Sequence, residues 1–109
     1  MAVAVRLVLT SFPNESTARR IADRIVENQL AACVSLLPGA QSIYFWEGKV
    51  QHESEWLGLI KTTEVLYPEL ETCLLAWHPY DTPECIAVDI TAGSPDYLLW
   101  LQAQCVERP

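Results

Sequence analysis

Residues 41–62 contain the feature that most restricts how this chain folds: two extended stretches joined by a tight turn. Residues 41–46 and 50–62 have the composition of strands, and only Glu47-Gly48-Lys49 separates them. A glycine in so short a connection accepts a positive φ, which the tight turns of hairpins require. The sequence therefore predicts a long antiparallel hairpin, with residues 51–55 near the turn exposed to water and the apolar end buried on both faces.

This hairpin is too long and too aromatic for one small core. Strands usually contain about 5–6 residues, and alternate side chains of a strand point to opposite faces. Exposed apolar patches and open strand edges are typical of surfaces that bind another chain. We therefore expect a compact homo-oligomer joined partly by strand pairing, with four aromatic residues at its interface: Tyr44, Phe45, Trp46 and Trp56. The alternative is that a C-terminal helix covers this patch within one chain.

Strand and helix patterns alternate on both sides of the hairpin. Residues 3–12 are aliphatic and β-branched, which predicts a strand, and Asn14 then caps a helix with an apolar stripe at helical spacing. Residues 32–37 form a second extended run, and Pro38-Gly39 predicts a break or bulge before residue 41. A helix over 63–78, regular from Tyr67, precedes a strand over 84–91. Ser94 then caps a last helix whose apolar face contains Leu98, Leu101 and Cys105.

The predicted order is β-α-β-β-α-β followed by a short helix. This order is that of the ferredoxin-like unit, an α+β sandwich in which two helices pack on one face of a four-stranded antiparallel sheet. At 109 residues the chain is expected to form a single domain over residues 1–109.

Charge and cysteine spacing restrict the partners and the compartment. The net charge of −7 makes nucleic acid and anionic membranes poor partners, and no apolar run is long enough to cross a bilayer. Arg6 interrupts the N-terminal apolar run, so we interpret this run as a strand and not as a signal peptide. The four cysteines form no CxxC pair, which favours reduced, buried thiols in a cytoplasmic protein.

The stretch WHPYDTPE, residues 77–84, is the first candidate site. A metal-binding interpretation places His78, Asp81 and Glu84 around one cation. A structural interpretation makes His78 the last helical residue, where an imidazolium suits the negative end of the helix dipole, and lets Asp81 bond its own turn. The sequence leaves both interpretations open.

Lys61 is the centre of a second candidate site. It ends a strand that should be buried on both faces, and a buried charge requires a partner. Glu84, Glu47 or an acid of a neighbouring chain could supply one, and with Tyr80 these residues would line a cleft between subunits. Such a pair would be either a structural ion pair or part of an anion-binding pocket. No GxSxG, P-loop, HExxH or Cys-His spacing occurs, so we do not expect an enzyme.

Five motifs in order resemble the CutA divalent-cation-tolerance family over nearly the whole chain: LAACVSLLPG (30–39), PGAQSIYFWEGK (38–49), LIKTT (59–63), HPYDTPE (78–84) and DYLLWL (96–101). The resemblance implies a ferredoxin-like subunit and a tight homotrimer held by strand pairing between subunits. It also implies a cytosolic bacterial or organellar setting, and a role in tolerance of divalent metals, copper above all, without an established reaction.

The resemblance also implies how copper would be held. The family's ligands are a cysteine near the end of the first strand and two histidines before Pro-Tyr, and these positions here are Thr10, Trp77 and His78. Several nitrogen or sulfur donors normally converge on Cu(II), and only His78 is one. We expect weak or regulatory binding of divalent metal and no required cofactor. A small-ligand signalling trimer of the PII type, or a scaffold whose trimer surface docks another protein, are the alternatives.

Overall fold

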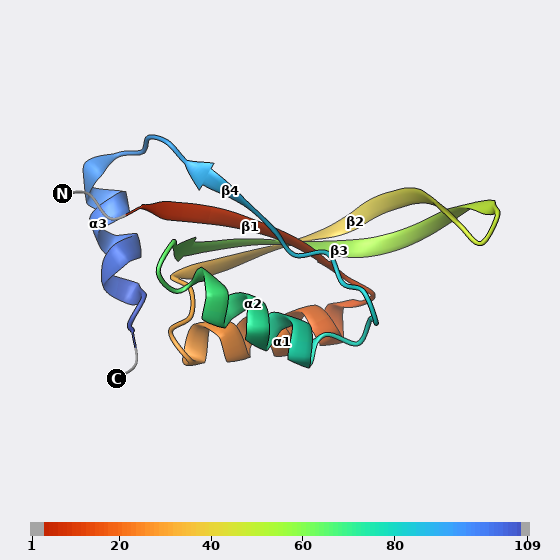
Figure 1. Ribbon diagram of the computed structural model, residues 1–109, viewed down its shortest axis with the longest axis horizontal. Coiled ribbons are helices and arrows are strands. Elements are labelled where there is room, and N and C mark those ends of the chain that lie inside the picture. Colours follow the sequence, from red (N-terminus) through yellow and green to blue (C-terminus); the bar gives the residue numbers. More distant parts are fainter. Residues whose placement is uncertain (1–3, 108–109) are drawn as a thin grey trace.

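The computed structural model describes residues 4–107, and its sheet has the strand order β2-β3-β1-β4 with every neighbouring pair antiparallel (Figure 1). The predicted order and the ferredoxin-like α+β arrangement are confirmed. The elements are β1 (Val5–Phe12), α1 (Glu15–Glu27), β2 (Cys33–Trp46), β3 (Lys49–Thr63), α2 (Tyr67–Trp77), β4 (Ile86–Ile90) and α3 (Pro95–Gln104).

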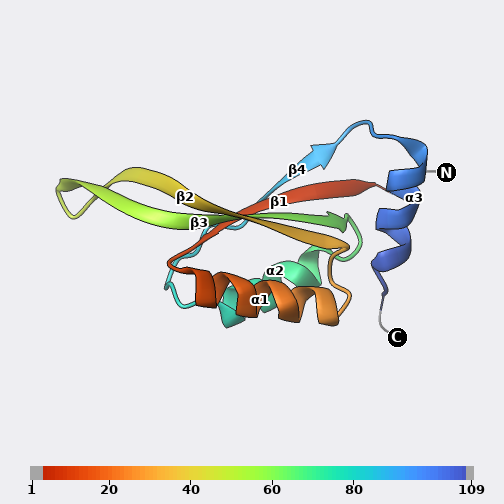
Figure 2. The same ribbon diagram turned by 180° about the vertical axis from the view of Figure 1, so that it is seen from behind.

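The main core lies between the sheet and the helices α1 and α2, which pack side by side beneath it (Figure 2). Asn14 accepts a hydrogen bond from the Thr17 amide at 2.9 Å and so caps α1 as predicted. The apolar stripe of α1 is buried because it faces the sheet. The largest fully buried side chains of the core are Val8, Phe12, Ile21, Ile25, Leu30, Ile60, Leu70 and Leu74.

The helix α3 packs at one end of the sheet, where Leu101 is buried together with Val5 and Ala32. Ser94 stands at the N-cap position, but its side chain makes no capping hydrogen bond. No helix of the described part of the chain is both long enough and apolar enough to span a membrane.

Some predicted boundaries shift by a few residues. The fourth strand covers Ile86–Ile90 and not 84–91, and α2 ends at Trp77, so that His78 is its C-cap residue. The predicted start of β1 at Val3 lies outside the described residues. The start of α2 at Tyr67 agrees with the prediction.

The hairpin of β2 and β3 is the most extended part of the molecule and projects beyond the helices (Figure 1). Its strands contain 14 and 15 residues, and Glu47 and Gly48 both have positive φ, as a primed two-residue turn requires. A bulge separates Leu37 from Ala40, as predicted, and Gly39 takes a positive φ there.

Aromatic and aliphatic side chains on the projecting part of the hairpin are exposed to solvent. Phe45 is 71% exposed and Trp46 60%, and the Tyr44 ring is also exposed. Trp56, the fourth residue predicted at an interface, is half-buried and packs against the core of its own chain, and its place at an interface stays a prediction. Its position on β3 opposite Phe12 explains this packing, because Phe12 points toward the helices.

Within residues 4–107, the face of the sheet opposite α1 and α2 is covered only at its end, by α3, and we name it the open sheet face. Leu7 pairs with Val88, and Leu9 pairs with both Leu59 and Ile86. Paired residues share a face, and the neighbouring Val8 is buried toward the helices, so these side chains point to the opposite side. Ile86 is 53% exposed and Val88 47%. The described part of one chain therefore leaves an apolar sheet surface without cover.

Gly58 allows β1 and β3 to pack closely above the helices. A Cβ atom at this position would lie 2.9 Å from Phe12 Cε2 and 3.0 Å from Thr10 Cγ2, both in buried side chains. We expect Gly58→Ala to lower the free energy of unfolding by about 1–3 kcal/mol, because the core must shift to admit the methyl group. Urea unfolding at one fixed protein concentration measures the change. Ser54→Ala, on the exposed part of β3, is the control, and an equal effect of both variants would contradict the prediction.

Candidate functional site

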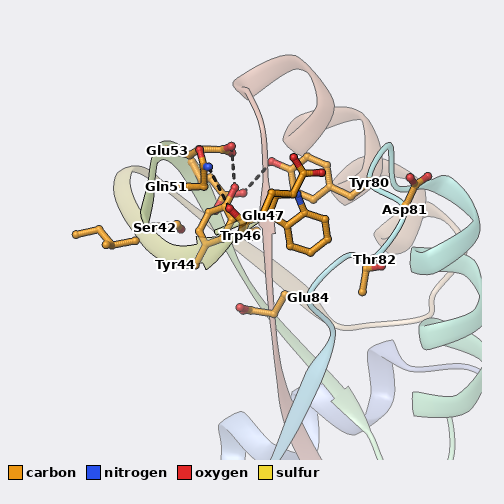
Figure 3. A pocket seen from close by; sticks show the side chains of 13 residues that line it. Ser42, Tyr44, Trp46, Glu47, Gln51, Glu53, Tyr80, Asp81, Thr82 and Glu84 are labelled. Atoms are coloured by element: carbon orange, nitrogen blue, oxygen red, sulfur yellow. Dashed lines mark hydrogen bonds between the residues drawn. The ribbon is translucent and has the colours of Figure 1, made fainter. Parts of the chain in front are cut away.

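A cleft of about 1060 Å³ lies where the hairpin leaves the body of the protein, between the hairpin and the segment 78–85 that joins α2 to β4 (Figure 3). None of the described residues that line it is cationic. A cleft lined by charges of one sign concentrates ions of the opposite sign. This cleft is therefore suited to a cation. Its carboxylates belong to Glu47, Glu53, Glu55, Asp81 and Glu84.

His78 fixes the segment 78–85 against β1. Its ring is buried, stacks on Phe12 at 5.4 Å between centroids, and lies 4.7 Å from the Tyr80 ring. The Tyr80 amide donates to Nδ1 at 3.1 Å, so Nδ1 accepts, and Nε2 then carries the proton that it donates to the Ser11 carbonyl at 2.7 Å. His78 is thus a neutral imidazole whose two nitrogens both bond the backbone.

Tyr80 closes the cleft by reaching from the segment 78–85 to the hairpin. Its hydroxyl donates to Glu55 Oε2 at 2.8 Å, and Glu55 is only 7% exposed. Burial, and then the hydrogen bond to Glu55, raise the pKa of Tyr80 well above its usual value. The phenol therefore remains a donor at neutral pH.

A second pair of the same kind lies on the hairpin itself. Tyr44 donates to Glu53 Oε1 at 2.8 Å, and this bond raises the pKa of Tyr44. Glu53 and Glu55 are two residues apart on β3, so their side chains point to the same face of the strand. The wall of the cleft thus contains two neighbouring carboxylates, each of which accepts one phenolic hydrogen bond.

The predicted metal set of His78, Asp81 and Glu84 is not assembled in one chain. Asp81 and Glu84 line the cleft and are exposed, whereas the ring of His78 is turned inward under Phe12. Within residues 4–107, no three His, Cys, Asp or Glu side chains are placed to hold a metal ion. Both ring nitrogens of His78 already have backbone partners, which is the physical reason that this histidine does not join the two acids.

Of the predicted cleft residues, Tyr80, Glu84 and Glu47 share one cleft, and Lys61 does not. Lys61 Nζ donates to the Tyr97 hydroxyl at 3.0 Å and lies 5.1 Å from the centre of that ring. This hydrogen bond raises the pKa of Lys61. The expected carboxylate partner is therefore replaced within the chain by a phenol of α3.

The two remaining family positions are used for packing. Thr10 is 1% exposed and would contact any Cβ atom placed on Gly58. Trp77 lies under the Arg24 guanidinium at 4.1 Å, a cation–π contact between α1 and α2. Neither residue reaches the cleft.

Glu55 is a site residue that the sequence does not predict. The sequence predicts that all of residues 51–55 are exposed to water, whereas Glu55 is buried. The available signal was the proline-flanked loop that holds Tyr80, since a tyrosine fixed in a turn requires an acceptor nearby.

The fold and the cleft define a class of small ferredoxin-like α+β proteins with an overlong β-hairpin and an anionic groove beside it. A family model described as CutA1 divalent ion tolerance protein matches residues 6–104. The chain belongs to this family.

Individual relatives agree over nearly the full length. A divalent-cation tolerance protein CutA from Pectobacterium atrosepticum is 45% identical over 97 residues, which cover 89% of this chain and 88% of the relative. The crystal structure of CutA1 from Oryza sativa superposes with a TM-score of 0.95 at 42% identity and covers 98% of both chains. A CutA from Archaeoglobus fulgidus, described as periplasmic, gives a TM-score of 0.90 at 31% identity and covers 94% of this chain and 99% of its own.

The hydrogen bond from Tyr80 to Glu55 predicts how stability changes at high pH. The unfolded chain releases the tyrosine proton near pH 10, whereas the folded chain retains it, so the folded state binds more protons and stability falls as pH rises above about 10. Tyr80→Phe should lower stability at neutral pH by about 1–3 kcal/mol, because Glu55 loses its donor.

The same variant should also reduce the loss of stability at alkaline pH, and a series of thermal unfolding curves measures both effects. Tyr67, whose pKa is also raised, contributes to that loss in both proteins. Tyr97→Phe controls for removal of a phenol outside the cleft. Identical alkaline slopes in the unmodified chain and Tyr80→Phe would contradict the assignment.

Proposed function

We propose that this chain acts as one domain of a cytoplasmic homotrimer in divalent-cation tolerance, attracts ions such as Cu²⁺ weakly at its acidic cleft, and catalyses no reaction. The observation that carries this proposal is an uncovered apolar sheet face directly beside an anionic cleft. Family membership supplies the link to divalent cations.

The proposed trimer gives the open sheet face and the hairpin the cover that one chain lacks. Ile86 and Val88 on this face, and Phe45 and Trp46 on the hairpin, expose large apolar side chains in contiguous strands. Patches of this kind mark interaction surfaces, and association of copies in closed symmetry buries the same patch in each of them. The edge strands β2 and β4 also present backbone groups that a neighbouring copy can pair. The number three follows the family resemblance.

Weak metal attraction follows from the composition of the cleft. Asp81 and Glu84 line it with three further carboxylates and without a cationic residue. The energy of a divalent ion in this field is twice that of a monovalent ion. Among the described residues, however, no set of donors converges to replace its hydration shell. Copper precedes the other divalent first-row metals in affinity for most sites. We therefore propose binding that is weak, sensitive to salt and strongest for copper.

Two further parts of the proposal rest on side-chain chemistry. The four cysteines are free thiols, which suits the reducing cytoplasm. The phenols of the cleft remain protonated and donate to neighbouring carboxylates, so neither Tyr44 nor Tyr80 supplies a phenolate nucleophile. A second candidate is a trimer that binds a small ligand, because the cleft, at about 1060 Å³, is no smaller than the pockets of about 300–1,000 Å³ that hold such molecules.

The trimer predicts a mass of three times 12.3 kDa by light scattering at micromolar concentration. Val88→Asp should reduce this mass, because the new carboxylate would be buried between copies without a partner. Val26→Asp is a matched control: Val26 is 43% exposed, close to the 47% of Val88, but lies on α1 in the other layer. A mass of one chain for the unmodified protein would end the proposal of a homotrimer.

Copper binding can be measured by calorimetry at low and high ionic strength. We expect weak binding that decreases with salt, and a severalfold loss of affinity when Asp81→Asn and Glu84→Gln are combined, because the cleft loses two of its charges. Asp23→Asn with Glu27→Gln removes the same net charge from the exposed side of α1 and is the control. Tight binding that ignores both salt and the cleft variant would show that copper is held elsewhere.

A further inference from the structure

We propose that the wall of the cleft is a binding site for an organic ammonium ion, a primary amine or polyamine, held by Glu55 and Glu53 between the rings of Tyr80 and Tyr44. This inference goes beyond divalent-cation tolerance and does not rest on metal binding.

Glu55 is the residue that points to a ligand. More than nine-tenths of it is buried, yet it lines the cleft, and only Oε2 accepts a hydrogen bond, from Tyr80. No ion pair or further hydrogen bond from the described residues reaches its other oxygen, Oε1. A carboxylate oxygen that reaches a cleft can form a charge-assisted hydrogen bond with an ammonium donor. The second oxygen of Glu55, which has no donor among the described residues, is therefore the acceptor that this site offers to such a group.

Glu53 is the second carboxylate of the proposed site and, like Glu55, accepts one hydrogen bond from a tyrosine. It lies on the same face of β3, two residues from Glu55, and only its Oε1 accepts a hydrogen bond, from Tyr44. A primary ammonium group has three donors, so one such group can bond the free oxygens of both carboxylates. Aromatic faces attract organic cations and pack against their methylene groups. Tyr44 and Tyr80 supply such rings at this wall.

The chemistry of the wall favours an organic cation over a metal ion. Metal ligands converge on one point, and the acidic groups of the described chain do not. Each phenol remains protonated and donates to its carboxylate, so the tyrosines offer ring faces and no phenolate oxygen. The cleft, at about 1060 Å³, has room for a molecule of many atoms.

The chain's own cations are mostly engaged away from the cleft. Arg6 lies near Glu64 and Asp89, Arg19 pairs with Glu15, and Lys61 bonds Tyr97. The exposed Lys49 at the hairpin turn is the side chain that a neighbouring copy could insert in place of a free amine. The experiment must therefore separate these two cations.

Calorimetric titration of the full chain with putrescine, at constant ionic strength, tests the site. We expect saturable binding that Glu55→Gln weakens at least about tenfold, because hydrogen bonds between charged partners are lost while the amide oxygen still accepts from Tyr80. Glu71→Gln is the matched control. Glu71 also accepts a phenolic hydrogen bond, from Tyr67 at 2.7 Å, but does not line the cleft, so this variant should bind putrescine unchanged. Thermal unfolding verifies that both variants fold.

The proposal is overturned by no saturable binding of putrescine, by equal losses in Glu55→Gln and Glu71→Gln, or by equal binding of Mg²⁺ at the same concentration, which indicates attraction by charge alone. Binding that appears only in Lys49→Ala would also overturn it, because a neighbour's lysine then fills the site. The oligomer mass and the copper titration are separate measurements, so a failure here leaves divalent-cation tolerance untouched.

Discussion

The long pairing of β2 with β3 is the constraint on which the rest of the structure depends. These strands continue well past the last residue that α1 and α2 can cover, because the turn at Glu47 and Gly48 lies far from the core. Their length creates both the exposed apolar hairpin and one wall of the cleft. A shorter hairpin would retain the ferredoxin-like core and lose both surfaces. The features relevant to function are thus additions to a core that could be built without them.

The second wall of the cleft depends on a short series of contacts that begins at His78. The imidazole joins the segment 78–85 to the Ser11 carbonyl and the Phe12 ring, and Tyr80 continues the series to Glu55 on the hairpin. The hydrogen-bond roles along this series are fixed. The Ser11 carbonyl accepts, the neutral His78 ring donates through one nitrogen and accepts through the other, and the Tyr80 hydroxyl donates. The cleft therefore has a defined shape, because the loop and the hairpin are fixed to each other across the end of β1.

Features set by local chemistry could be predicted from the sequence. Gly48, Pro38-Gly39 and Asn14 each determine a turn, a bulge or a cap through neighbours only a few residues away, and the structure confirms all three. The partners of Glu55 and Lys61 could not be predicted, since Tyr80 and Tyr97 are 25 and 36 residues away in the sequence. The inward orientation of His78 likewise depends on the Phe12 ring of a different element.

Thr10 and Trp77 stand where the family resemblance implies copper ligands, and the cleft is lined by carboxylates. Both features restrict the donors that the cleft can offer to a cation. Thr10 and Trp77 contribute to packing, and the nitrogens of His78 bond the backbone, so the soft and borderline donors of this region are absent from the cleft or already in use. What remains is oxygen, from Glu53, Glu55 and their neighbours. Oxygen donors alone hold copper less tightly than sets that include nitrogen or sulfur, and they also suit hard cations and ammonium groups. The described residues of this cleft therefore offer a cation charge and hydrogen bonding, and no converging set of coordinating donors.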